Sequence, residues 1–550
     1  MISNAFYEDA LALTKQMVAI PSVNGTEGER VVAEFVEDWL RKLPYFTEHP
    51  DQLVVRPLKD DVLGRRNVLA LACGEKRPSG RTVILHGHHD TVGIDDFGSL
   101  REYAFDCDAL PEKIRQLTDD PDVLADIASG NWLFGRGAGD MKCGVAVCML
   151  LLRYFIEHRD AFSGNLLFMT NPVEENQHTG VIEALDVLEE LQASRGLQYR
   201  LALNTDSIPP LFPGDTVHTC FSGASGKILP CFYIIGKPTH VGQCFQGLSA
   251  SMIAAELVRR IELNLEFVSS CGKEYTIPPT VLKLKDLKAT YDVQTAVAAF
   301  VYFNLFLYDV EMDQVFAKLR RTAADAMAAV ADFTDRQYQA YCQATGAMEY
   351  RPEPVPCRVM DYSELYRAAK AADAGIDAAI DRITADGLRE NLDRRELTLQ
   401  IVQELATRAN IHTPTTILFL APPYLPRNMM KADDPRDAEV TASVAETLAR
   451  AGAEVGETIR LRPVNPYPTD CSYLRADDSD ASLQMVVDNF PNMKAIYSVP
   501  VQQIKRVNIP AFVVAGSCKD AHKWTERLNL DYTFRKLPVV LLRILEKELG

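Results

Sequence analysis

Short apolar runs alternate with longer helical patterns through the first 220 residues, and this alternation constrains the fold more than any other feature. The apolar runs span residues 82–85, 165–169 and 201–203, and helical patterns lie near 141–158 and 180–193. Short apolar strands that alternate with helices form a mostly parallel sheet covered by helices on both faces. We therefore predict an α/β fold of this kind.

Acidic and imidazole side chains follow each of these apolar runs. His88 and Asp90 follow the first run, Glu174 and Glu175 the second, and Asp206 the third. In such sheets, ligands bind beyond the carboxyl ends of the strands. The placement of these side chains therefore agrees with their chemistry.

Five short segments together supply the side chains of a complete two-metal hydrolase centre. The segments are His86-Gly87-His88-His89-Asp90, Gly135-Arg136-Gly137-Ala138-Gly139-Asp140, Glu174-Glu175, Asn204-Thr205-Asp206 and Ala521-His522. Two histidines and three carboxylates can hold two divalent ions that share one bridging carboxylate, and one further carboxylate remains as a base. Each segment alone would be a weak signal, and the set predicts the site.

The spacing of His88 and Asp90 favours a metal ligand with a supporting carboxylate. Residues i and i+2 of a strand point the same way, so Asp90 can orient the imidazole of His88. The alternative is a strand end that carries surface histidines. We expect His86 and His89 to have structural or pocket-lining roles.

Two acidic features each have a structural alternative. Glu174 and Glu175 point in opposite directions if their backbone is extended, so one can bind metal while the other acts as general base. Acidic pairs are also common on protein surfaces. Asp140 can be a bridging ligand, a helix N-cap or both. His178 could also be a ligand, although we expect it to line the entrance.

The pattern changes after about residue 227 and predicts an inserted α+β unit. A strand is expected at 227–235, a helix at 247–264, an alternating strand at 280–285 and a long helix at 311–345. The last part of the chain returns to the style of the first. We therefore expect a catalytic domain in two parts, 1–220 and 386–550, with a lid or dimerisation domain at 221–385.

Composition excludes several classes of protein. A chain of 550 residues exceeds what one hydrophobic core usually supports, so two domains are expected. No apolar run is long enough to span a bilayer and the start lacks a signal-peptide pattern, so we expect neither membrane insertion nor secretion. Twelve scattered cysteines without a CxxC pair favour reduced thiols in a cytoplasm. The net charge of −17 disfavours nucleic acid as a partner.

Several of these segments resemble the zinc metallopeptidase family of aminoacylase, glutamate carboxypeptidase, bacterial di- and tripeptidases and acetylornithine deacetylase. The resemblance rests on 87–92 (GHHDTV), 135–144 (GRGAGDMKCG), Glu174-Glu175 and the late His522, and it covers roughly 1–265 and the last fifty residues. Within that family, 283–288 (KLKDLK), 421–424 (APPY) and 519–527 (KDAHKWTER) are most similar to the arginine-utilisation (RocB-type) branch.

The resemblance implies a role for each site residue. His88, Asp140 and Asp206 would hold one zinc ion, and Asp140, Glu175 and His522 would hold the second. Asp90 would orient His88, and Glu174 would be the general base. His240 matches a lid histidine that reaches an active site in relatives, often that of the partner subunit, and stabilises the oxyanion.

The sequence also departs from the family pattern. An acidic insertion at roughly 95–130 could reshape the pocket, and the central region is longer than a typical lid. The arginine that binds the substrate carboxylate in the family has no match here. Because of the longer central region, the dimer contact of relatives does not carry over directly, and a homodimer is possible rather than implied.

We expect hydrolysis of an amide bond in a short peptide or an N-acyl amino acid, by metal-activated water with Glu174 as the base. Zinc is the expected metal, and cobalt or manganese is possible. One alternative is hydrolysis of N-carbamoyl amino acids. Another is a metal-stabilised binding protein that has lost catalysis, although a carboxylate at position 174 argues against it.

Overall fold

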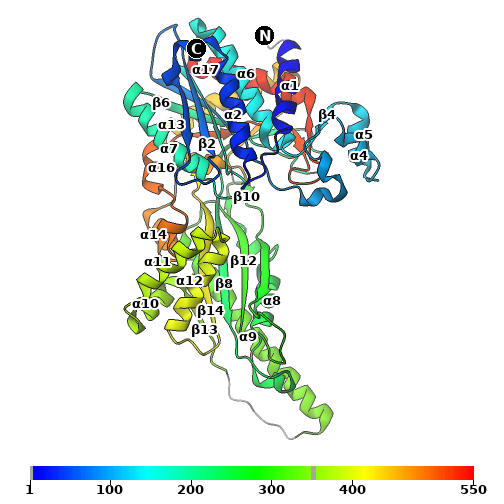
Figure 1. Ribbon diagram of the computed structural model, residues 1–550, viewed down its shortest axis with the longest axis vertical. Coiled ribbons are helices and arrows are strands. Elements are labelled where there is room, and N and C mark those ends of the chain that lie inside the picture. The colour runs from blue at the N-terminus through cyan, green and yellow to red at the C-terminus, as the bar shows by residue number, and fades with distance from the viewer. Residues whose placement is uncertain (1–3, 213, 348–354, 468) are drawn as a thin grey trace. The chain divides into compact units, whose positions relative to one another are not determined.

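The computed structural model describes residues 4–212, 214–347, 355–467 and 469–550, and the chain divides into two compact units (Figure 1). The first unit comprises Met1–Ala224, Asn428–Asp477 and Pro500–Gly550. The second unit comprises Ser225–Arg427 and Asp478–Val499.

A nine-stranded sheet forms the centre of the first unit. Its order is β1-β2-β5-β3-β6-β17-β7-β15, and β16 pairs with β7. The strands are β1 (Leu53–Pro57), β2 (Arg66–Cys73), β3 (Arg81–His88), β5 (Asn165–Asn171), β6 (Gln198–Asn204), β7 (His218–Ala224), β15 (Asn428–Met429), β16 (Ile459–Arg462) and β17 (Ala511–Val513). The four central strands, β5, β3, β6 and β17, are parallel, and the strands that flank them pair antiparallel. The predicted α/β class is thus confirmed, with a parallel centre inside a mixed sheet.

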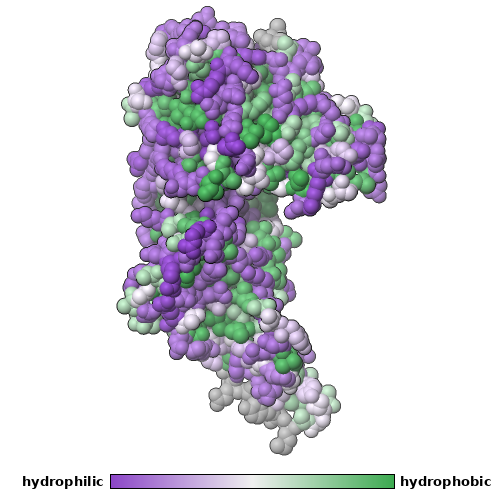
Figure 2. All heavy atoms as spheres, viewed as in Figure 1, coloured by the Kyte–Doolittle hydropathy of each residue, from purple (hydrophilic) through white to green (hydrophobic). Residues whose placement is uncertain are grey.

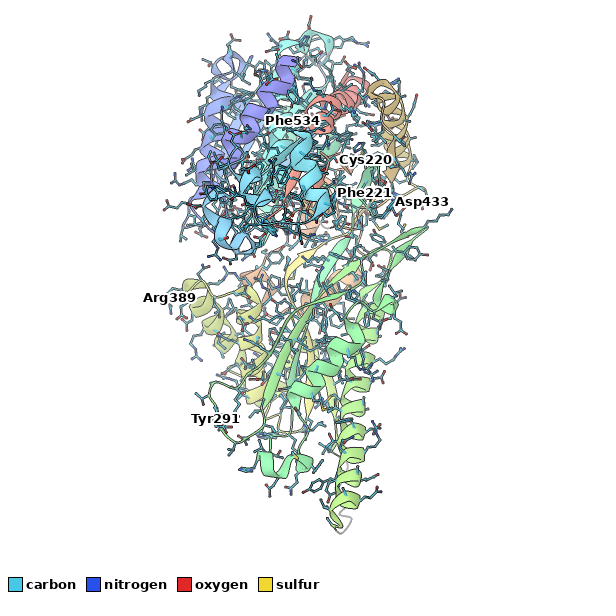
Figure 3. All side chains as sticks on the ribbon, turned by 90° about the vertical axis from the view of Figure 1, so that its right-hand side faces the viewer. Cys220, Phe221, Tyr291, Arg389, Asp433 and Phe534 are labelled. Atoms are coloured by element: carbon cyan, nitrogen blue, oxygen red, sulfur yellow. The ribbon has the colours of Figure 1, made fainter. Side chains whose placement is uncertain are left out.

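Helices cover both faces of this sheet because its strands are apolar on both sides. One hydrophobic core joins alternate strand residues such as Val83 and Leu85 to α1 (Asn4–Val18), α2 (Gly28–Arg41), α6 (Cys143–Glu157), α13 (Pro435–Val455) and α17 (Leu537–Leu549). Residues between them, such as Ile84, point to the other face and are equally buried. Helix α7 (Thr179–Arg195) packs against β2 and β5. Figure 3 labels Cys220 and Phe534 in this packed interior.

The second unit is built on a five-stranded sheet of order β11-β12-β8-β14-β13. The strands are β8 (Gly226–Ile235), β11 (Thr280–Asp286), β12 (Ala298–Leu307), β13 (Arg358–Asp361) and β14 (Thr415–Leu425). All neighbours pair antiparallel except β13 and β14. Helices α8 (Ala250–Ile261) and α9 (Met312–Thr345) pack on each other and on the sheet, and α10 (Tyr362–Ala372), α11 (Ile376–Arg389) and α12 (Arg394–Arg408) form a second helical group.

The second unit extends beyond the insertion expected at 221–385. Strand β14 lies between β8 and β13, and α12 packs on it, so 386–427 belongs to this unit rather than to the catalytic domain. A later excursion, Asp478–Val499, adds α14 (Asp480–Asp488) and α15 (Met493–Ile496), which pack against α9 and α11. The apolar run at 415–420 has the same pattern as the strands of the first unit, so its local pattern does not assign it to either unit.

The surface is polar with scattered apolar side chains. On the face drawn in Figure 2, hydrophilic and hydrophobic residues are interspersed. Tyr291 is 91% exposed and points away from the second unit (Figure 3). Among the described residues, no helix combines the length and the apolar character needed to cross a membrane.

Candidate metal centre

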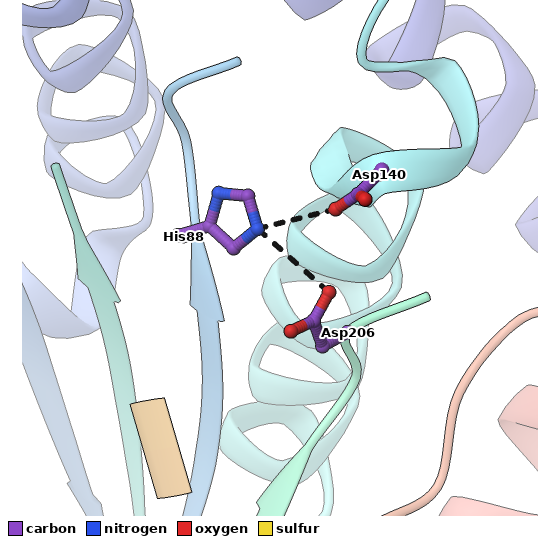
Figure 4. Close-up of side chains that lie close together, drawn as sticks. All are labelled: His88, Asp140 and Asp206. Atoms are coloured by element: carbon purple, nitrogen blue, oxygen red, sulfur yellow. Dashed lines mark ion pairs between the residues drawn. The ribbon is translucent and has the colours of Figure 1, made fainter. Parts of the chain in front are cut away.

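His88, Asp140 and Asp206 converge at the carboxyl end of the central strands (Figure 4). His88 is the last residue of β3, and its Nε2 atom lies 3.3 Å from Oδ1 of Asp140 and 3.7 Å from Oδ1 of Asp206. All three side chains are buried. These are the three residues expected to hold the first ion.

His522, Asp140 and Glu175 form an adjoining group. Nε2 of His522 lies 3.2 Å from Oδ2 of Asp140 and 3.0 Å from Oε1 of Glu175. Asp140 thus turns one carboxylate oxygen to each histidine. This is the arrangement expected of a carboxylate that bridges two ions.

The donor atoms suit divalent metal ions. Two ligand atoms at a tetrahedral angle, each about 2.0–2.2 Å from a zinc ion, lie about 3.3–3.6 Å apart, close to the separations found here. Among the described residues, Nε2 of His88 is a buried nitrogen that makes no hydrogen bond, although two carboxylates face it. Imidazole nitrogen and carboxylate oxygen are ligands of zinc, and of manganese and cobalt. The residues present therefore fit a two-metal site.

The electrostatics of the metal-free protein show how strongly this site attracts positive charge. Burial lowers the pKa of His88, but Asp140, Asp206 and Asp90 outweigh that effect and hold the pKa well above its ordinary value. Burial likewise opposes protonation of His522, yet Asp140 and Glu175 raise its pKa to about 11. Without metal, protons on the two imidazoles balance part of the carboxylate charge.

Asp90 connects the histidine side of the site to the Glu174-Glu175 pair. Its Oδ1 atom lies 3.4 Å from Nδ1 of His88, which also lies 3.2 Å from the backbone oxygen of Asp90, and Oδ1 accepts the backbone N–H of Glu174 at 3.0 Å. Its Oδ2 atom accepts the N–H of Glu175 at 3.1 Å and the side-chain amide of Asn24 at 3.0 Å. Burial raises the pKa of Asp90, but its contact with His88 outweighs this and holds the pKa at about 2.

Glu174 lies beside both groups of candidate metal ligands, and the pKa of its carboxyl is shifted. Its side chain is buried within reach of His88 and Glu175. Burial raises the pKa of Glu174 well above its ordinary value; His88 opposes the rise, and Asp206 and Glu175 add to it. A carboxylate with a raised pKa is a better proton acceptor than an ordinary glutamate.

A buried glutamate that the sequence reasoning did not single out fixes the loop that carries Asp140. Oε1 of Glu526 accepts the backbone N–H groups of Gly137, Gly139 and Asp140 at 2.9, 3.1 and 3.2 Å. Arg136 donates to its Oε2 atom at 2.6 Å. Burial raises the pKa of Glu526 to about 7. The sequence signal was its position four residues after His522, in a segment already noted for its resemblance.

Gly137 is required in this loop. Its φ is +79°, and a Cβ atom there would lie 2.5 Å from Cγ2 of Thr91. The paired glycines before Asp140 therefore allow a tight loop whose N–H groups converge on one carboxylate.

The acidic insertion at 95–130 forms a small core of its own and holds the segment that carries His522. Its core contains Phe97, Leu110 and Val123. Asp126 binds Nε of Arg527 at 2.6 Å and Nζ of Lys519 at 2.8 Å, and Asp122 binds both cations as well. The insertion thus supports the two flanks of the His522 loop.

The other histidines of the first unit lie outside both ligand groups. Nε2 of His86 lies 2.7 Å from Oδ1 of Asn171, and Nδ1 of His89 lies 3.1 Å from Oγ1 of Thr170. Burial lowers the pKa of both imidazoles, to about 3 for His89. His178 was expected to line an entrance, but it is buried, and its Nδ1 atom lies 2.9 Å from Oδ1 of Asp470. Asp470 was not identified from the sequence.

His240 belongs to the second unit and is exposed. Its Nδ1 atom accepts the backbone N–H of Gly242 at 3.0 Å and so caps the short helical segment Val241–Gln246. Neither ligand group includes it.

Residues 103–547 match the model of the peptidase family M20/M25/M40. The chain belongs to this family. The resemblance seen in the sequence is thereby confirmed, and the protein is a metal-dependent hydrolase. A binding protein that has lost catalysis is set aside. His88 and Asp90 lie before the matched range.

Two relatives from Bacillus subtilis (strain 168) match nearly the whole chain. Protein RocB is 35% identical over 530 residues, which cover 96% of this chain and 93% of RocB. Uncharacterized protein YqjN is 32% identical over 552 residues, with 97% and 95% covered. Among solved structures, the M20 family metallo-carboxypeptidase Sso-CP2 from Sulfolobus solfataricus is similar in fold, with a TM-score of 0.52, 10% identity and coverage of 98% and 99%.

Proposed function

We propose that this hydrolase cleaves the amide bond of a short peptide or an N-acyl amino acid at a two-metal centre. His88, Asp140 and Asp206 would hold one ion, and Asp140, Glu175 and His522 the other. The observation that carries the proposal is the placement of the two Asp140 oxygens, 3.3 and 3.2 Å from the two imidazole nitrogens. When bound, two divalent ions polarise a carbonyl and make water acidic enough to lose a proton near neutral pH.

Glu174 acts as the general base in this proposal. It takes the proton of the attacking water and later returns it to the amine that leaves. Burial raises the pKa of its carboxyl above the ordinary value, and a more basic carboxylate takes up a proton more readily. Asp90 holds the backbone of Glu174 and thereby sets the base in place.

The identity of the metal, the partner and the compartment are further parts of the proposal. We infer zinc, because its preferred ligands are those present, with cobalt or manganese as substitutes. His240 would donate to the oxyanion that develops on the substrate, either within its own chain or across a homodimer. A cytoplasmic location fits the twelve free cysteines.

The substrate side chain is proposed from likeness alone. The sequence resembles the arginine-utilisation (RocB-type) branch and RocB is similar over nearly the whole chain, so we propose arginine-related peptides or N-acyl amino acids as first candidates. Fold and family do not fix specificity, since one site can serve several related amides. N-carbamoyl amino acids remain the second candidate.

A substrate panel tests the proposal. Protein loaded with zinc, cobalt or manganese is assayed with dipeptides, N-acyl amino acids and ureido acids, each set including arginine. We expect turnover of a dipeptide or N-acyl amino acid that a chelator abolishes and added metal restores. Turnover confined to ureido acids would replace the proposed substrate class by the second candidate. Turnover that persists without metal would refute the proposed mechanism.

A further inference from the structure

Behind Glu174 lies a buried imidazole–carboxylate pair to which the proposed chemistry assigns no role. Nδ1 of His178 lies 2.9 Å from Oδ1 of Asp470 and 3.7 Å from Oε1 of Glu174. His178 is 6% exposed and Asp470 is 1% exposed. One ring nitrogen therefore faces two carboxylates, one of which is the proposed base.

The backbone fixes the distance between His178 and Glu174. Val173 has a φ of +67° and His178 a φ of +55°, and the N–H of His178 donates to the carbonyl of Val173 at 2.8 Å. This closes the turn that carries Glu174 and Glu175 and places His178 at the start of α7. The imidazole is thus tied to the segment that it faces.

Asp470 is held in place by contacts within its own segment and with Asn428. It begins the short helix Asp470–Tyr473, which Thr469 caps through the N–H of Cys471 at 3.2 Å. The side chain of Asn428 donates to the carbonyl of Cys471 at 2.6 Å. The ring of Tyr473 lies 5.2 Å from that of His178. The partner of the imidazole is therefore rigidly placed.

These contacts favour a hydrogen-bonded pair over a third metal site. The Nδ1 atom, which is the ring nitrogen that faces Glu174, is already within hydrogen-bond distance of Asp470. The remaining oxygen of Asp470, Oδ2, lies 3.5 Å from Nε2 of His86, whose shorter contact is to Asn171. A carboxylate that fixes the tautomer and orientation of an imidazole is a recurrent arrangement beside catalytic groups.

We propose that His178, oriented by Asp470, is a positioning residue for the carboxylate of Glu174. This inference rests on the proposed role of Glu174 as the base. Glu174 has three rotatable side-chain bonds and is surrounded by the carboxylates of Glu175, Asp206 and Asp470. The Nδ1–H of His178, which donates to Asp470, attracts Oε1 of Glu174 electrostatically across 3.7 Å.

Two substitutions at His178 separate the N–H group from the bulk of the side chain. Glycine and asparagine both tolerate the positive φ at this position, so neither adds backbone strain. Asparagine places an amide N–H near the position of Nδ1, and glycine does not. We expect His178→Gly to lower kcat roughly 10- to 100-fold, as removal of outer partners does at metal sites, with KM changed by less than about twofold. His178→Asn should recover most of that loss.

Substitutions at Asp470, the partner of His178, and at a control histidine complete the experiment. Asp470→Asn should lower kcat less than His178→Gly, and the double variant should equal His178→Gly, because Asp470 acts through His178. The control is His218→Ala. The side chain of His218 is 22% exposed, and its Nε2 atom lies 3.4 Å from Oε2 of Glu457. Its ring stacks on that of Tyr532, with the ring centres 3.5 Å apart, and it lies outside the ligand groups. The kcat of His218→Ala should match that of the unsubstituted protein.

Metal content, Tm and crystal structures of the metal-loaded variants are measured beside turnover. Both ions should remain, and the Glu174 carboxylate should move in His178→Gly and stay in His178→Asn. An unchanged kcat in His178→Gly, equal losses in the two His178 variants, or an unmoved Glu174 would overturn the positioning role. Failure of the proposed function would look different: Glu174→Gln would keep its turnover, or the unsubstituted protein would cleave nothing in the panel, while the crystal structures would still decide the role of His178.

Discussion

The carboxylate of Asp90 accepts the backbone N–H of Glu174 at 3.0 Å. The same carboxylate contacts the ring of His88 and the N–H of Glu175. One buried side chain therefore sets the distance between a ligand of the first ion, a ligand of the second and the proposed base. These residues lie in two segments, 88–90 and 174–175, which are far apart in the sequence and which Asp90 joins directly.

We predict that Asp90→Asn lowers both metal affinity and turnover roughly 10- to 100-fold, the usual loss when a carboxylate behind a metal-binding histidine is replaced. The amide keeps the shape but offers an N–H where the carboxylate accepts one. Zinc titration and kcat/KM measure the two effects. Asp95→Asn is the control, since that side chain is 98% exposed. A loss of turnover with unchanged metal affinity would contradict the joint role.

Replacement of Glu526 should destabilise the fold. Glu526→Ala leaves Arg136 without its buried partner and three loop N–H groups without their acceptor, so we expect the free energy of unfolding to fall by about 3–5 kcal/mol. Urea denaturation of the metal-free protein measures it. The exposed pair of Glu190 with Arg56 provides the control, and Glu190→Ala should cost less than about 1 kcal/mol. Equal effects of the two variants would show that Glu526 does not anchor the loop.

Metal binding should release protons. Asp140 and Glu175 raise the pKa of His522 to about 11, and the pKa of His88 is also raised, so both imidazoles are protonated in the metal-free protein near neutral pH. An ion binds only to the unprotonated ring, so affinity should rise as pH rises between about 6 and 8, by up to about tenfold per unit for each displaced proton. Calorimetry in buffers of different ionisation enthalpy counts the protons. We expect at least two per protein molecule; none would mean that the histidines are not ligands.

His240 is predicted to act in catalysis without holding metal. His240→Ala should keep both ions and the fold and lose roughly 10²–10³-fold in kcat, the usual cost of one oxyanion donor. Mixing His240→Ala protein with Glu174→Gln protein then tests which chain supplies the imidazole. Recovered activity in the mixture indicates a dimer with shared sites. No recovery after confirmed subunit exchange indicates that each chain uses its own histidine, and unchanged kcat in His240→Ala would refute the role.

The parts of the site that follow strand ends could be predicted from the sequence because position along a parallel strand also fixes position in space. His88, Glu175 and Asp206 each follow an apolar run, and the structure brings them to one edge of the sheet. Asp90 lies two residues after His88, and this spacing predicted that the two side chains would lie close together. Local pattern was sufficient for these residues.

Contacts between segments that are distant in the chain could not be predicted from local sequence patterns. Glu526 lies in a segment noted for its resemblance, but its contacts, like those of Asp470, form only when the Asp140 loop and the Glu174 turn fold against them. The end of the second unit was missed for the same reason, since the pairing of β14 with β8 depends on tertiary structure and not on the composition of β14. The burial of His178 also follows from packing against Tyr473, which no spacing in the chain reveals.

Comparing Glu174→Gln with Glu175→Gln tests the proposed two-metal centre, because these neighbouring glutamates have different roles in it. Each variant is loaded with zinc, its metal content is measured by elemental analysis, and its turnover is measured on the same preparation. We predict two ions and no turnover for Glu174→Gln, and loss of one ion for Glu175→Gln. Full activity in both variants, exchanged effects, or a protein that holds no zinc, manganese or cobalt after reloading would contradict this proposal.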